Sequence, residues 1–100
     1  MNDHIDDLTV TFIEDGVERV QEIDKYILSK GAWTTIMFKY QEWLPAKQEY
    51  GPPKYTIRRY QKRNDQYWQK SKFNISSNDQ ARKIIDTLTQ WLVAEESNSV

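Results

Sequence analysis

Apolar and polar residues alternate along several short stretches of this chain, and a period of two residues is typical of β-strands. Four stretches show this alternation: residues 8–13, Trp33–Leu44, Tyr55–Arg63 and Tyr67–Ile75. Asp15-Gly16 follows the first stretch, and Asn64-Asp65 separates the last two. Because such residue pairs favour tight hairpin turns, the pattern predicts antiparallel strands joined in sequence.

Residues 17–28 are open to two interpretations. Val17, Val20, Ile23 and Ile27 are spaced three, three and four residues apart, which suits an amphipathic helix. The hairpin signal at Asp15-Gly16 instead favours a returning strand. Residues 45–53, "PAKQEYGPP", lie after the stretch Trp33–Leu44, and their prolines predict a loop.

The last quarter of the chain has a helical period. Ser76, Ser77 or Asn78 can cap the helix, and an apolar stripe follows at Ala81, Ile84, Ile85, Leu88 and Leu92. We predict one domain over residues 1–100 of the α+β class: an antiparallel meander of four to five strands followed by one C-terminal helix packed on the sheet. In this arrangement Ile84, Ile85 and Leu88 pack against Ile57.

Charge is distributed unevenly along a chain whose formal net charge is only -1. Residues 1–30 carry eight acidic and three basic side chains, whereas residues 31–72 carry nine basic and three acidic ones. Residues 73–100 are again acidic, with four acidic and two basic side chains. This segregation predicts one electropositive surface on an otherwise acidic protein.

The residues that could perform chemistry are few. The chain has no cysteine and a single histidine, His4, which lies in a polar terminus without obvious partners. The acidic pairs near the two ends look like solvated termini, and the three glycines form no phosphate-binding loop. We therefore expect a non-enzymatic protein with no cofactor, no metal, no small-molecule substrate and no membrane span, located in the cytoplasm or at the nucleoid.

Basic and aromatic residues are concentrated in residues 55–76, where Asp65 is the sole acidic residue. If Ile57 faces the helix, alternation places Arg58, Tyr60 and Lys62 on the opposite face, and Lys70 and Lys72 share a face of the next strand. Cations bind phosphates, and aromatic rings stack on unpaired bases. The stretch thus predicts a site for single-stranded nucleic acid, either DNA or RNA.

A simpler explanation of the same stretch involves no ligand. Lysines on exposed strands can prevent sheets from aggregating, and strand aromatics can serve cross-strand packing. The alternative function is a dimeric protein-interaction module of the same fold without affinity for nucleic acid. Trp91 lies beside Leu88 and Leu92 and adds apolar surface for a twin helix or strand, so we expect a homodimer with either function.

The segment from Lys54 to Trp91 resembles a known family. "YTIRRY" is similar to the first core strand of the single-stranded-DNA-binding transcriptional coactivator called positive cofactor four and of its small bacterial relatives. "QKRNDQYWQ" corresponds to the hairpin, "KSKFNIS" to the basic strand and "SNDQARKI" to the start of the helix. Ser71 and Asn74 stand where that family has glycines.

The resemblance implies a curved antiparallel sheet, backed by a helix, that dimerises and holds a single strand in a transcription-regulating role. Three residues match family positions of the same character: Arg58, Tyr60 and Lys72. Strand alternation and the hairpin position add six more candidates for nucleic-acid binding: Lys39, Lys62, Arg63, Tyr67, Trp68 and Lys70.

Overall fold

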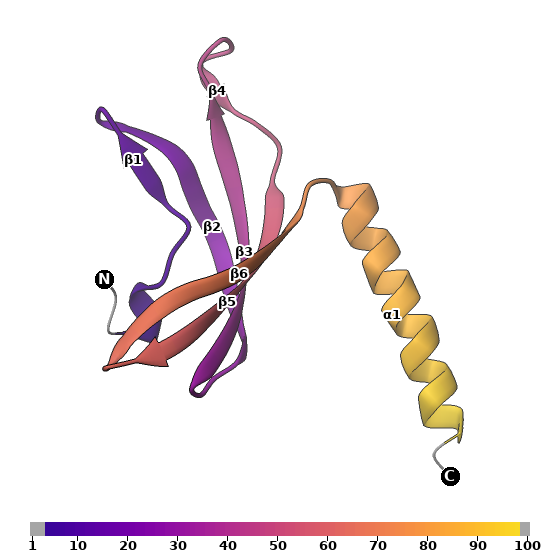
Figure 1. The fold of residues 1–100 in the computed structure, drawn as a ribbon. Helices are drawn as coiled ribbons and strands as arrows, with labels where there is room; N and C mark the ends of the chain where they lie inside the picture. The colour runs from indigo at the N-terminus through magenta and orange to yellow at the C-terminus, as the bar shows by residue number, and fades with distance from the viewer. Residues whose placement is uncertain (1–3, 99–100) are drawn as a thin grey trace.

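The computed structural model describes residues 4–98, which form six strands, one short 3-10 helix and one long α-helix. The elements in chain order are η1 (Ile5–Asp7), β1 (Phe12–Glu14), β2 (Val17–Ser29), β3 (Trp33–Leu44), β4 (Glu49–Tyr50), β5 (Lys54–Arg63), β6 (Gln66–Ile75) and α1 (Asn78–Asn98). The predicted α+β class is confirmed, as an antiparallel meander followed by a single helix (Figure 1).

The sheet is antiparallel throughout and has the order β1-β2-β3-β5-β6, with β4 paired to β3 (Figure 1). Asp15-Gly16 and Asn64-Asp65 form its two tightest turns, and all four residues have positive φ angles between 51° and 78°. Two consecutive residues with positive φ form the hairpin turn whose twist matches that of the strands. Both predicted hairpins are therefore confirmed.

Residues 17–29 form strand β2, so the helical interpretation of this stretch is wrong. The register between β2 and β3 shifts at Ile23 and again at Leu28, where β2 carries an extra residue. Each bulge reverses which face the following side chains occupy. Val20 and Ile27 consequently both pack on the core although they are seven residues apart, an odd number that would place them on opposite faces of a regular strand. The bulge at Ile23 therefore explains why the apolar spacing of this strand resembles that of a helix.

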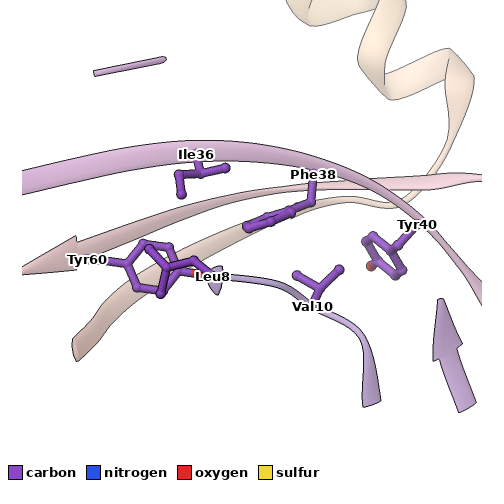
Figure 2. Close-up of a cluster of buried hydrophobic side chains, with 6 residues drawn as sticks. All are labelled: Leu8, Val10, Ile36, Phe38, Tyr40 and Tyr60. Atoms are coloured by element: carbon purple, nitrogen blue, oxygen red, sulfur yellow. The ribbon is translucent and has the colours of Figure 1, made fainter. Parts of the chain in front are cut away.

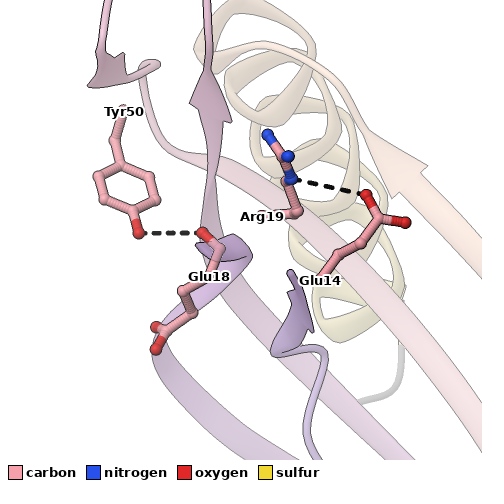
Figure 3. Close-up of polar contacts among 4 residues, drawn as sticks. All are labelled: Glu14, Glu18, Arg19 and Tyr50. Atoms are coloured by element: carbon pink, nitrogen blue, oxygen red, sulfur yellow. Dashed lines mark hydrogen bonds and ion pairs between the residues drawn. The ribbon is translucent and has the colours of Figure 1, made fainter. Parts of the chain in front are cut away.

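Two short strands differ from the prediction. β1 begins only at Phe12, although Leu8 and Val10 point into the core as the alternation predicts. β4 lies inside the predicted loop, where the Tyr50 ring meets Trp43 edge-on at 5.1 Å between centroids. The Tyr50 hydroxyl also donates a 2.9 Å hydrogen bond to the Glu18 carbonyl, near the 3.6 Å ion pair between Arg19 and Glu14 (Figure 3).

The hydrophobic core lies on one side of the sheet, which we call the inner face. Its buried side chains come from β3, β5 and the segment before β1: Leu8, Val10, Ile36, Phe38, Tyr40 and Tyr60 (Figure 2). The Lys25 ammonium holds the segment in place by donating 2.8 Å hydrogen bonds to the carbonyls of Asp6 and Leu8. The N-terminal segment, rather than the helix, therefore covers the sheet.

The predicted packing of the helix on the sheet is wrong for the single chain. α1 begins with Ser77 Oγ accepting a 3.1 Å hydrogen bond from the Gln80 backbone N–H, so Ser77 is the cap. The helix then projects away from the sheet, with Ile85 60% and Trp91 65% exposed (Figure 1). Ile57 consequently has no cover from the apolar stripe of α1.

Candidate nucleic-acid interface

The register of the sheet divides the predicted site residues between two faces. Ile36, which is in the core, pairs with Arg58, and Arg58 pairs with Lys72, so these cations lie on the inner face. Directly paired residues share a face of an antiparallel sheet. The inner face therefore carries five of the candidates: Arg58, Tyr60, Lys62, Tyr67 and Lys72.

The other four candidates belong to the opposite side of the sheet, which we call the outer face. Lys39 pairs with Tyr55, Arg63 pairs with Gln66, and Trp68 pairs with Gln61. Lys70 is the extra residue of a bulge in β6, and it lines a shallow outer-face depression together with Arg63, Asn64 and Trp68. The prediction that Lys70 and Lys72 share a face is therefore wrong, because the bulge separates them.

Tyr60 belongs to the core and is only 5% exposed. Its ring lies in the same buried cluster as Leu8, as Figure 2 shows. Burial raises the pKa of the Tyr60 hydroxyl above the ordinary value of a tyrosine, because an ionised hydroxyl would lose its hydration. The predicted stacking of Tyr60 on a base is therefore wrong, since the N-terminal segment occupies the space that a base would need.

The inner-face cations near the β5–β6 hairpin contact polar or aromatic side chains. Arg58 Nη1 donates a 2.9 Å hydrogen bond to Gln69 Oε1, and the Lys62 ammonium lies 5.5 Å from the centroid of the Tyr67 ring. Lys54 has a different environment, because it donates a 2.6 Å hydrogen bond to Glu42 that raises the pKa of its ammonium. Thus Lys54 is paired with a carboxylate, whereas Arg58 and Lys62 form no ion pair within residues 4–98.

Two tryptophans on the outer face lie in one cross-strand row. Gln61 pairs with Trp33 on one side and with Trp68 on the other, and each tryptophan is 39% exposed. Neighbouring strands are about 4.8 Å apart, so the two backbones are separated by roughly 10 Å with Gln61 between them. This row presents two aromatic rings to solvent on one side of the sheet.

Cations surround the tryptophan row. The Arg59 guanidinium lies over the Trp33 ring, 4.2 Å from its centroid, while Arg63 and Lys70 lie beside Trp68. We call the set Trp33, Arg59, Arg63, Trp68 and Lys70 the outer platform. Asp65 is the sole acidic residue between Lys54 and Ile75, and it lies in the turn at the tip of the hairpin. The outer platform therefore combines open aromatic surface with positive charge.

Sequence reasoning missed Trp33 and Arg59, and it included Lys39, which lies elsewhere. Strand alternation gives the relative face of residues within one strand, but only the pairing of β3 with β5 places Trp33 near Arg59. Lys39 is four residues from Thr35, the partner of Arg59, which is about 13 Å along β3. Lys39 also pairs with Asp24, so it is not part of the outer platform.

Residues 4–98 contain no group of three or more His, Cys, Asp or Glu side chains that could hold a metal ion. In the same part of the chain, no helix has the length and apolar character needed to cross a membrane. No protein-family model, curated protein or solved structure matches the chain.

Proposed function

We propose that this protein binds single-stranded nucleic acid through the outer platform. The observation that carries the proposal is the row of two half-open tryptophans bordered by Arg59, Arg63 and Lys70. Unpaired bases stack on aromatic rings irrespective of sequence, and cations bind the phosphates between them. A duplex fits such a surface less well, because its bases are already stacked on one another.

The resemblance of residues 54–91 to positive cofactor four supports the same proposal and favours DNA as the ligand and transcription as the process. The matching residues Arg58 and Lys72 belong to the same hairpin as the outer platform but lie on the inner face, on the opposite side of the sheet. The third match, Tyr60, contributes to folding instead of binding. The rings that stack on bases are therefore Trp68 and Trp33.

Trp68→Ala should weaken the binding of a single-stranded oligonucleotide of about 20 nucleotides by roughly 1–3 kcal/mol, the typical contribution of one stacked base. The dependence of affinity on salt should hardly change, because stacking releases no counterions. Fluorescence anisotropy with a labelled oligonucleotide across a salt series measures both quantities, with a duplex of equal length beside it.

Phe12→Ala is a matched control, since Phe12 is 52% exposed and lies on β1, at the other edge of the sheet from β6. This variant should bind like the unaltered chain. Equal affinity for single strand and duplex would contradict the stacking mechanism. A complete lack of binding at low salt would instead favour a protein-interaction module.

The second part of the proposal is a homodimer. Tyr26, Met37, Ile57 and Phe73 form a continuous cross-strand row on the outer face. Tyr26 and Phe73 are more than half exposed, as are most apolar side chains of the second half of α1. Soluble monomers seldom leave so much contiguous apolar surface open, and a second copy supplies a matching surface of the same kind.

Sedimentation of the unaltered chain at tens of micromolar should give twice the 12.0 kDa chain mass. Leu88→Asp should shift the population to the monomer, because a charge in the apolar stripe of α1 would lose its hydration in the interface. Gln90→Asp is the matched control, since it adds the same charge about 200° around the helix. A monomer of the unaltered chain under these conditions would count against the dimer.

A further inference from the structure

β6 is a free edge of the sheet, and its cations point to both sides of that edge. The strand pairs only with β5, and α1 contacts the sheet mainly through β6, the strand that immediately precedes it. Lys70 is on the outer face, whereas Lys72 is on the inner face about 7 Å further along the strand. An edge strand also directs half of its backbone N–H groups outward, where they can donate to phosphate oxygens.

The positions of Arg58 and Lys72 on the inner face are unfavourable for the stability of the fold. Arg58 and Lys72 are directly opposite each other on neighbouring strands, and like charges in this position repel. Arg58 is held by the neutral Gln69, and neither cation forms an ion pair within residues 4–98. Two cations on directly paired residues, neither of them in an ion pair, are the kind of side chains that attract a phosphate.

We propose that the bound strand continues from the outer platform around the free edge of β6, so that a phosphate reaches Arg58 and Lys72 on the inner face. This inference rests on the proposed function and adds the path of the ligand. The path selects flexible strands, because a duplex with a persistence length of about 50 nm cannot turn around one strand edge. A single strand can make this turn while its bases remain on the outer platform.

The N-terminal segment limits how far the strand can extend across the inner face. Leu8 and Val10 cover the centre of that face, and Ile5 packs against the edge of the core. Arg58 and Lys72 therefore lie at the border of the covered area, within reach from β6. The bound strand must stay at the edge instead of crossing the whole sheet.

The path predicts different length dependences for the two lysines of β6. Lys70→Ala should weaken labelled oligothymidylates of every length, from about 4 to about 20 nucleotides. Lys72→Ala should leave the shortest oligonucleotides unchanged, because they are held on the outer platform, and should weaken the longer ones roughly fivefold at 0.1 M salt. For the longer ones, its salt slope should fall by about 0.7. Fluorescence anisotropy over a length and salt series measures these changes.

Lys47→Ala is the matched control, because Lys47 is an exposed lysine in the turn between β3 and β4 and should not affect binding. Lys72 is exposed, so its removal should not impair folding. A Lys72→Ala variant that binds long oligonucleotides normally, while Trp68→Ala and Lys70→Ala bind weakly, would overturn the path but leave the proposed function intact. Equal weakening at all lengths would also overturn the path. An unaltered chain that binds no oligonucleotide would overturn the proposed function itself.

Discussion

Phe38→Ala should lower the free energy of unfolding by about 3–5 kcal/mol, a large part of the stability of a typical small domain. Phe38 is completely buried on the central strand β3 and packs within the inner-face cluster (Figure 2). Alanine at this position leaves a cavity among the neighbouring core side chains. Urea denaturation followed by circular dichroism measures the loss.

Phe12→Ala serves as the control for Phe38, since it removes the same side chain from a half-exposed position. Its cost should stay below about 1 kcal/mol, as for most surface substitutions. A similar small loss for Phe38→Ala would mean that the core is elsewhere, with α1 folded onto the sheet in solution.

Leu8→Ala should lower the free energy of unfolding by about 2–5 kcal/mol, although Leu8 belongs to no strand or helix. Leu8 is 2% exposed and covers the inner face between β3 and β5, while its carbonyl accepts a hydrogen bond from Lys25. Its removal opens the core to water on the side that the N-terminal segment covers. Denaturation by urea again measures the change.

Ile13→Ala is the control for Leu8, because Ile13 is 60% exposed in the same part of the chain. The losses in free energy of unfolding caused by Leu8→Ala and by Ile13→Ala should differ by more than about 1.5 kcal/mol. Equal and small losses would show that the N-terminal segment is a dispensable tail. In that case Tyr60 would be available for stacking, and the family-like site on the inner face would regain its aromatic ring.

The strands and turns of this fold could be predicted because their causes are local. Alternating apolar residues define β3 and β5, and residue pairs such as Asp15-Gly16 accept the positive φ that a tight hairpin requires. The helix start was also readable, since Ser77 supplies a cap immediately before an apolar stripe. The direction in which the helix projects could not be predicted. An apolar stripe indicates that this surface is covered, but it does not indicate whether the same chain or another molecule covers it.

The residue types of the candidate site were predictable from the sequence, but their arrangement was not. Alternation within β5 correctly separated Arg58 from its neighbour Arg59. We expected Lys70 and Lys72 on the same face, but a single bulge in β6 places them on opposite faces. No residue type in "QKSKF" predicts this bulge. Trp33 lies in the outer platform because β3 pairs with β5, whose residues are nearly thirty positions later in the sequence. A pattern of neighbouring residues cannot predict such a pairing.

The sequence by itself determined the α+β class, the hairpins and the concentration of positive charge between Lys54 and Lys72. These features depend on side-chain period, backbone preference and composition, which act over a few residues. Only the tertiary structure decided that Leu8 and Tyr60 form the core, and that Trp33 and Trp68 face solvent together. Such outcomes depend on strand register and on which segment packs on the sheet, and both are set by the packing free energy of the whole chain.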